Sequence, residues 1–156
     1  LETIKNRRSC RAYKPEQITN EELDAVLEAG TYAASAMGRQ SAKIVVVQDA
    51  AARAQLTRMN AAVMGKDTDP MYGAPTILVG LADAHAANAV PDGSLVMGSC
   101  WINRAKEEFE TEEGKALLRQ WGIEGDWVGI GHCILGYPAA DPKPAAPRKP
   151  DYIVKV

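Results

Sequence analysis

The sequence predicts a single domain, residues 1–156, in which α-helices cover both faces of a β-sheet. The 156-residue chain is long enough to bury one core, and its composition, 46% hydrophobic and 24% charged, is that of an ordinary globular domain. Three segments are apolar on both faces, which is typical of strands that are covered on both sides. Amphipathic helical segments separate these strands, which indicates a sheet between two layers of helices.

The first helix is predicted over residues 20–30. The Thr19 hydroxyl can accept a hydrogen bond from the amide of Glu22, whose carboxylate can reach back, so this pair forms a capping box. Gly30 favours a left-handed stop at the other end. One face of the helix is apolar and consists of Leu23, Val26 and Leu27.

A buried strand and a second helix follow. The strand is the apolar run 43–48, and the helix begins after Asp49, a good N-cap, and stops at Gly65. Turn residues occupy 67–72. The helix is expected to face the core with Leu56, Met59 and Val63.

The second half of the chain contains two further strands and one more helix. The strands are the apolar runs 75–81 and 127–135, and the helix begins near Thr111 and stops at Gly122. This helix is expected to bury Leu117, Leu118 and Trp121. We also expect core positions for His132, which lies in the last strand, and for Trp101 and Trp127.

Charge and composition exclude several classes of protein. A net charge of −2 gives no overall attraction to nucleic acid or to an anionic membrane surface. No apolar run reaches the ~18 residues of a membrane span, and the first residues lack the apolar core of a signal peptide, so we expect a cytoplasmic protein. The three cysteines form no paired framework, which suits a reducing compartment. Two histidines without cysteine neighbours at ligand spacing predict no metal site.

The N-terminal segment is strongly basic. It holds five cations within ten positions and no acid between Glu2 and Glu16: Lys5, Arg7, Arg8, Arg11 and Lys14. Guanidinium groups suit bidentate contact with phosphate, and Ser9 adds a hydroxyl. A second basic group, Lys143, Arg148 and Lys149, lies in the proline-rich tail. The two groups could clamp one phosphate, or each could be solvated surface.

The chain has no Walker loop, and its Gly129-Ile130-Gly131 run lacks the third glycine of a dinucleotide fingerprint.

Several segments resemble the nitroreductase family. Arg7-Arg8-Ser9-Cys10-Arg11-Ala12-Tyr13 resembles the family's opening Arg-Arg-Ser-x-Arg-x-Tyr signature, and the loop 33–41 is similar to its flavin-contacting loop. Four further pieces follow in the family's order: Tyr72-Gly73-Ala74-Pro75-Thr76, Ser99-Cys100-Trp101-Ile102, Leu135-Gly136-Tyr137-Pro138 and Pro147-Arg148-Lys149-Pro150. The resemblance therefore spans nearly the whole chain.

The resemblance implies a fold, a cofactor and a set of binding residues. The fold would be α+β, a three-layer α/β/α sandwich with a mainly antiparallel central sheet, and the cofactor would be flavin mononucleotide (FMN). Arg7, Arg8 and Arg148 would hold the phosphate, with Ser9 and Arg11 near the ribityl chain and ring. Gln40 would border the isoalloxazine, and the backbone of Gly98 and Ser99 would donate to its N1 and O2 edge. Asn60 is a weaker candidate for cofactor binding.

The resemblance also implies an activity and an assembly. The protein would take hydride from NADPH or NADH and reduce nitroaromatic, quinone or similar electron-poor small molecules in a ping-pong mechanism. The reaction would occur at flavin N5, so no catalytic side chain is expected. Flavin sites would lie between the two subunits of a homodimer. Two alternatives remain open: a sister flavoenzyme for enone reduction, flavin reduction or dehalogenation, and a non-catalytic protein that binds FMN or another phosphorylated ligand.

The chain departs from the family pattern in two places. Ala34, Gly38 and the pair Ser41-Ala42 stand where many relatives have Pro, Asn and Pro-Trp. In addition, residues 94–97 run almost directly into 98–101, where the family normally has a helix of about a dozen residues. Loss of that helix should expose a large cavity. We therefore expect that residues are missing from the chain near positions 97–99.

Overall fold

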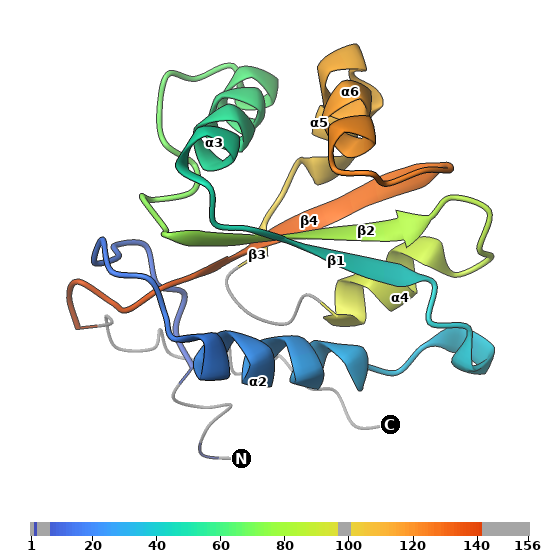
Figure 1. Ribbon diagram of the computed structural model, residues 1–156, viewed down its shortest axis with the longest axis horizontal. Coiled ribbons are helices and arrows are strands. Elements are labelled where there is room, and N and C mark those ends of the chain that lie inside the picture. Colours follow the sequence, from blue (N-terminus) through green and yellow to red (C-terminus); the bar gives the residue numbers. More distant parts are fainter. Residues whose placement is uncertain (1, 3–6, 97–100, 142–156) are drawn as a thin grey trace, which may run out of the picture.

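The protein contains an antiparallel four-stranded sheet between two layers of helices (Figure 1). The computed structural model describes residues 2, 7–96 and 101–141. The strands are β1 (Ala42–Val47), β2 (Thr76–Asp83), β3 (Trp101–Ile102) and β4 (Trp127–Leu135). They lie in the order β1-β2-β4-β3, and every pair is antiparallel. This arrangement confirms the predicted three-layer α+β fold.

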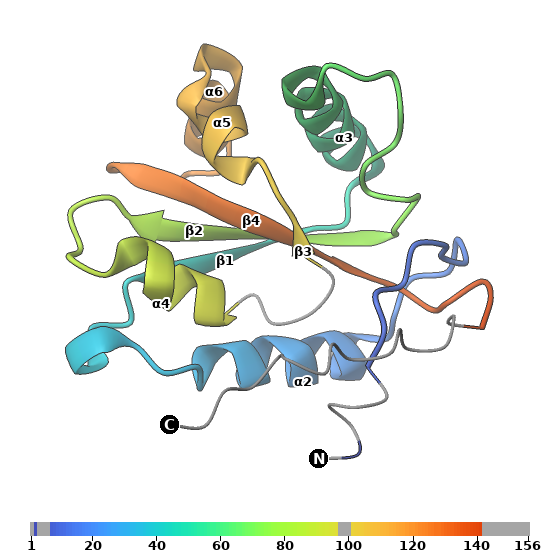
Figure 2. The same ribbon diagram turned by 180° about the vertical axis from the view of Figure 1, so that it is seen from behind.

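The helices divide between the two faces of the sheet. Figures 1 and 2 show α3 (Ala50–Met64), α5 (Ala105–Glu110) and α6 (Glu112–Gln120) on one face. The opposite face is covered by α2 (Asn20–Thr31) and α4 (Ala89–Val96), and a short 3-10 turn, η1 (Ala36–Gly38), follows α2. Among the described residues, no helix combines the length and the hydrophobicity that a membrane crossing requires.

The core lies mainly between the sheet and the layer of α3, α5 and α6. Its largest cluster includes Leu56 of α3, Val79 and Leu81 of β2, and Phe109 of α5, each almost fully buried. A smaller cluster on the other face joins Leu23 of α2 to the sheet. The central strand β2 is buried along nearly its whole length because helices cover both of its faces.

Most predicted helix ends are confirmed. The capping box of Thr19 and Glu22 is present at the start of α2, Asp49 caps α3, and Gly65 ends α3 in the left-handed conformation. The predicted stop at Gly30 is wrong. The helix continues to Thr31, and the amide of Ala33 donates to the Gly30 carbonyl instead. The helix therefore ends without a residue in the left-handed conformation.

Predictions of burial in β1 and α3 are wrong for the described chain. The strand predicted to be buried, now β1, has only Val47 buried, and Val46 is 37% exposed. The reason is position, since β1 is an outer strand with one neighbour in the sheet. In α3, Val63 is also 37% exposed, and the polar Asn60 faces the core instead.

The structure contains three elements that the sequence did not predict: α4, β3 and α5. Pro91-Asp92-Gly93 has the composition of a turn but lies within α4, where Gly93 packs against Ile130 so closely that a Cβ would lie 2.6 Å from its side chain. Trp101, expected in the core, lies on the edge strand β3 and is 38% exposed. The expectation of missing residues near 97–99 lies outside the described residues.

Candidate functional site

The basic N-terminal segment is fixed to the end of the sheet. Tyr13 and Pro138 form an isolated antiparallel bridge, in which the Lys14 amide donates to the Tyr137 carbonyl at 2.9 Å and the Ala139 amide donates to the Ala12 carbonyl at 2.9 Å. Arg11 therefore lies immediately before the point where the chain pairs with the segment that follows β4.

Side chains strengthen this attachment. The Tyr13 hydroxyl donates to the carbonyl of Ile134 at 3.4 Å, and Gln17 Nε2 donates to the carbonyl of Pro75 at 2.6 Å. Gly136 lies against Tyr13 and Pro75, and a Cβ there would come within 2.8 Å of both rings. The segment is thus packed against the start of β2 and the end of β4. This packing fixes the position of the backbone from which its basic side chains extend.

The basic residues of this segment face outward or lie near the surface. Arg7 and Arg11 are exposed, while Arg8 and Ser9 are partly buried, and Arg8 donates to the Arg7 carbonyl at 2.8 Å. Within the described part of the chain, no acidic side chain forms an ion pair with Arg7 or Arg11. Two uncompensated guanidinium groups are therefore available for an external anion.

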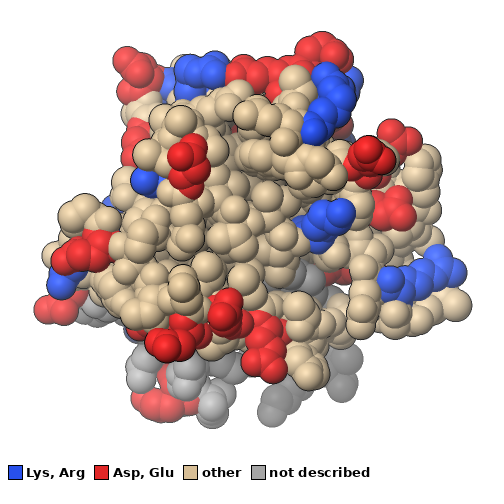
Figure 3. All heavy atoms as spheres, in the orientation of Figure 1, with Lys and Arg blue, Asp and Glu red and all other residues tan. Residues whose placement is uncertain are grey.

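The surface of α2 has the opposite charge. Acidic side chains gather over this helix (Figure 3) and come from Glu21, Glu22, Asp24 and Glu28. An anionic ligand is repelled from this surface. The N-terminal segment is therefore the better anion site of the two.

The start of α2 is bonded to the segment after β4. The Tyr137 hydroxyl donates to Glu22 Oε2 at 2.5 Å. This hydrogen bond, followed by those from Thr19, lowers the pKa of the Glu22 carboxyl, and the same carboxylate raises the pKa of Tyr137. The contact holds the helix next to the bridge of Tyr13 and Pro138.

Gln40 lies beyond the other end of α2. It follows η1 and has a left-handed φ of 49°, as Met37 has a φ of 57°, which is uncommon for residues other than glycine. Its amide donates to the Ser35 hydroxyl at 3.2 Å. The exposed Gln40 borders a hollow of about 370 Å³, whose other lining residues include Leu27, Ala33, Ile44 and Val46. A single chain therefore does not bring Gln40 to the basic segment.

Asp92 of α4 holds the loop that carries Gln40. Its Oδ1 accepts from the Ala36 amide at 3.0 Å and its Oδ2 accepts from the Ser41 hydroxyl at 3.2 Å, and the side chain is only 5% exposed. Sequence reasoning missed this residue because Pro91-Asp92-Gly93 has the composition of a surface turn.

Asn60 lies in the layer on the opposite face of the sheet. Its side chain is fully buried, and its Nδ2 donates to the Asn103 carbonyl at 2.8 Å and to the Glu108 carboxylate. Its Oδ1 accepts from Arg104 Nε at 3.0 Å. Both ends of the amide are thus hydrogen-bonded inside the protein, and the predicted contact of Asn60 with the cofactor remains a prediction.

His132 lies beside this network without a hydrogen bond to it. Its Nε2 lies 3.3 Å from Glu108 Oε2, and both side chains are fully buried. The prediction that His132 is a core residue is therefore confirmed. A buried carboxylate on α5 is the part that the sequence did not indicate.

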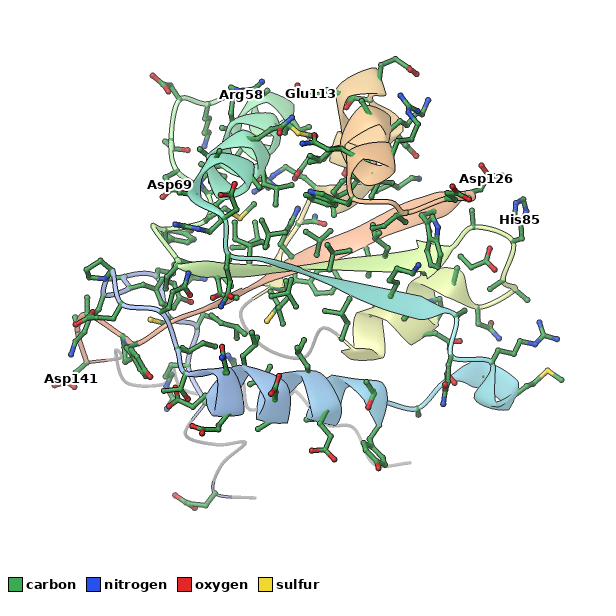
Figure 4. All side chains as sticks on the ribbon, in the orientation of Figure 1. Arg58, Asp69, His85, Glu113, Asp126 and Asp141 are labelled. Carbon is green, nitrogen blue, oxygen red and sulfur yellow. The ribbon has the colours of Figure 1, made fainter. Side chains whose placement is uncertain are left out.

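A second hollow, of about 710 Å³, lies between α3 and the loop that follows it, over residues 65–74. Arg58 is on its wall and pairs with Glu113 of α6 at 2.5 Å; Figure 4 shows the two side chains pointing toward one another. This hydrogen bond raises the pKa of Arg58 and lowers that of Glu113. The Arg58 charge is thus compensated, in contrast to those of Arg7 and Arg11.

Four predicted residues cannot be placed. Lys5, Gly98, Ser99 and Arg148 lie outside the described residues, as does the rest of the basic tail. Their predicted contacts remain predictions.

Comparisons with known proteins agree with this fold. Residues 4–71 match the sequence model of the Nitroreductase family. A protein of Archaeoglobus fulgidus named "Putative NADH dehydrogenase/NAD(P)H nitroreductase" is 29% identical over 153 residues, which cover 88% of this chain and 84% of that protein. The crystal structure of a nitroreductase with bound FMN from Bacteroides fragilis matches with a TM-score of 0.88 and 27% identity, over 99% of this chain and 97% of that one.

The chain thus resembles nitroreductases in the sequence of its N-terminal part and in its fold. A nitroreductase with bound FMN from Desulfitobacterium hafniense has the same fold, with a TM-score of 0.85, 21% identity and coverage of 99% of this chain and 96% of that one. The segment that resembles the family's opening motif pairs with the residues that follow β4, so the basic residues singled out from the sequence lie at a defined place in this fold.

Proposed function

We propose that the protein is an FMN-dependent oxidoreductase that takes hydride from NADPH or NADH. One observation carries the proposal: the bridge between Tyr13 and Pro138 joins the basic N-terminal segment to the segment that leads toward Arg148. Two basic segments can bind one phosphate only if their backbones are held close together. The nitroreductase from Bacteroides fragilis, which has this fold and 27% identity, binds FMN.

The donor groups of the segment fit a phosphate. Arg7 and Arg8 supply planar guanidinium forks for phosphate oxygens, and Arg148 would complete the clamp. Ser9 and Arg11 would contact the ribityl chain and ring, and Gly98 and Ser99 would donate backbone N–H groups to the N1 and O2 edge. The exposed and uncompensated charges of Arg7 and Arg11 support this assignment.

When bound, FMN supplies the redox chemistry through N5 of its ring. The chain's own residues then have three tasks: to hold the phosphate, to orient the ring and to leave one face open to small molecules. We propose a ping-pong reaction in which the nicotinamide leaves before an electron-poor acceptor, such as a nitroaromatic or a quinone, enters. Cysteines without a paired framework fit a reducing compartment, and we place the activity in the cytoplasm.

We also propose that the site is shared between two copies of the chain. The basic segment precedes the start of α2, whereas Gln40 follows its end, and the acidic surface of α2 lies between them. In a homodimer with twofold symmetry, the Gln40 loop of one subunit can reach the basic segment of the other. A dimer would therefore bring the basic segment and the Gln40 loop together in one site.

Cofactor binding is tested by melting the apo-protein with and without FMN. At 100 times the dissociation constant, FMN should stabilise the fold by about 2.7 kcal/mol, and the melting temperature should rise accordingly. Arg7→Ala and Arg11→Ala should each weaken FMN binding about tenfold or more, since each removes a charge-assisted contact. Arg119→Ala, at an exposed position of α6, is the matched control and should bind like the wild type. An unchanged melting temperature in the presence of saturating FMN would refute the proposal.

The reaction is tested with the FMN-loaded protein under anaerobic conditions. NADPH or NADH should bleach the flavin absorbance, and a nitroaromatic or a quinone should restore it. Bleaching with slow recovery for both acceptors would identify a sister activity, such as enone reduction, flavin reduction or dehalogenation. FMN binding without bleaching would identify a protein that only binds the ligand.

A further inference from the structure

We infer that Asp92 is a positioning residue that holds the Gln40 loop in its active conformation. This inference rests on the proposed function, because it concerns the same flavin site. Asp92 lies on α4, and both of its carboxylate oxygens accept hydrogen bonds from the loop: one from the Ala36 amide at 3.0 Å and the other from the Ser41 hydroxyl at 3.2 Å.

The two contacts lie on either side of Gln40. Ala36 begins η1 and Ser41 directly follows Gln40, so the carboxylate closes the loop across its base. Inside the loop, the Gln40 amide donates to the Ser35 hydroxyl at 3.2 Å. Together these hydrogen bonds tie the loop to α4 and to itself.

The backbone of the loop needs this support. Met37 and Gln40 both have left-handed φ angles, which cost energy for residues with a Cβ and persist where surrounding contacts impose them. The Asp92 carboxylate, at 5% exposure, makes charge-assisted hydrogen bonds that water screens little. Its removal should release the loop and leave the rest of the fold intact.

The placement of Asp92 is itself fixed. Gly93, the next residue, packs directly on the side chain of Ile130 in β4, with no room for a Cβ. The helix α4 also contacts β1, β2 and β4. The position of Gln40 is therefore set from the sheet through α4, while its side chain remains exposed and free to meet a second subunit.

The first test is limited trypsin digestion of the apo-protein, followed by mass spectrometry of each cleavage site. Arg39 lies in the loop, so Asp92→Ala should speed cleavage after Arg39 about tenfold, while cleavage after Lys66 stays unchanged. Asp92→Asn should largely restore the wild-type rate, because its oxygen still accepts from Ala36 and its NH₂ can donate to Ser41. Equal rates after Arg39 in the wild type and Asp92→Ala would overturn the inference.

A matched control comes from the other hollow. Asp69 also accepts two hydrogen bonds from its own loop, from the amides of Met71 at 2.8 Å and Gly73 at 2.6 Å. Asp69→Ala should speed cleavage after Lys66 and not after Arg39. If Asp92→Ala fails to fold, Ser41→Ala, which removes one of the two contacts, replaces it and should give a smaller increase at Arg39.

The second test measures FMN binding to the same apo-proteins by quenching of flavin fluorescence. Asp92→Ala should raise the dissociation constant about tenfold and Asp92→Asn should restore it. A loosened loop with unchanged FMN affinity would refute the positioning role. A wild-type protein that binds no FMN would instead refute the proposed function, and the digestion would still decide whether Asp92 orders the loop.

Discussion

At the scale of single residues, the core contains a buried carboxylate, that of Glu108. Glu108 is fully buried, accepts from Asn60 Nδ2 and lies 3.3 Å from Nε2 of His132. It therefore joins α3, α5 and β4 inside an apolar layer. A buried polar group that loses its partner carries a large desolvation cost.

Replacement of Glu108 by Ala should lower the free energy of unfolding by about 2–4 kcal/mol, because it removes one hydrogen-bond partner of Asn60 and leaves a cavity beside the buried His132 ring. Glu110→Ala is the control on the same helix. Glu110 is exposed and pairs only with Lys106 at 3.8 Å, so its replacement should change stability by less than about 0.5 kcal/mol. Denaturation with urea measures both values, and equal effects would show that the buried network contributes nothing.

At the scale of elements, the contact between α5 and β4 depends on a glycine. A Cβ at Gly129 would clash with the backbone carbonyl of Ala105, which cannot move without the helix. At Gly131, by contrast, a Cβ would meet the ring of Trp101, which is an edge side chain that can shift.

Gly129→Ala should therefore destabilise the protein more than Gly131→Ala does. We expect a cost of about 3 kcal/mol at Gly129, at the upper end of what overpacking causes, and about 1 kcal/mol at Gly131. Thermal melting of the two variants gives the comparison. The reverse order would mean that α5 can move away from β4 at little cost.

The bond between α2 and the segment after β4 should make stability depend on pH. Because the pKa of Glu22 is lowered in the folded protein, its contribution is present above the ordinary value of 4.5 and is lost as the pH falls through the lowered folded pKa. Tyr137→Phe removes the largest cause of the shift. Its melting temperature should lie below that of the wild type at pH 7, and the difference should shrink below pH 4.5.

The control for this experiment is Tyr32→Phe, since Tyr32 is 82% exposed and lies at the other end of α2. It should melt like the wild type at every pH. A difference between Tyr137→Phe and the wild type that is the same at pH 7 and pH 3 would show that the hydroxyl acts without Glu22.

Local sequence signals predicted the elements whose ends are determined locally. The capping box at Thr19, the cap at Asp49, the left-handed Gly65 and the apolar run of β4 all depend on neighbouring residues, and all are confirmed. The failures depend on tertiary contacts. The helix α4 forms around Pro91-Asp92-Gly93 because the sheet and the 35–41 loop hold it there. The burial of Asn60 was missed for the same reason, since its partner Glu108 lies on α5, a helix that the sequence did not indicate.

At the scale of the whole molecule, the proposed shared site makes a prediction about mixtures of variants. One variant carries Arg7→Ala and Arg11→Ala, and the other carries Gln40→Ala. Each alone should bind FMN weakly. After subunit exchange, a mixed dimer has one site with both defects and one intact site, so a 1:1 mixture should regain about a quarter of the tight sites.

Fluorescence titration with FMN measures the recovered sites. A mixture of wild-type protein with the double arginine variant, at the same total concentration, controls for the exchange itself. If all residues of a site come from one chain, the mixture of the two variants should recover no tight binding.

The order of the strands also has a consequence for synthesis on the ribosome. The central pair is β2 and β4, yet β4 leaves the ribosome only after α4, β3, α5 and α6 have been made. At about 5–20 residues per second, one edge of the most apolar strand stays open for roughly 3–10 s. An open apolar edge readily pairs with another chain. A nascent chain that stalls before Trp127 is therefore a natural client for chaperones.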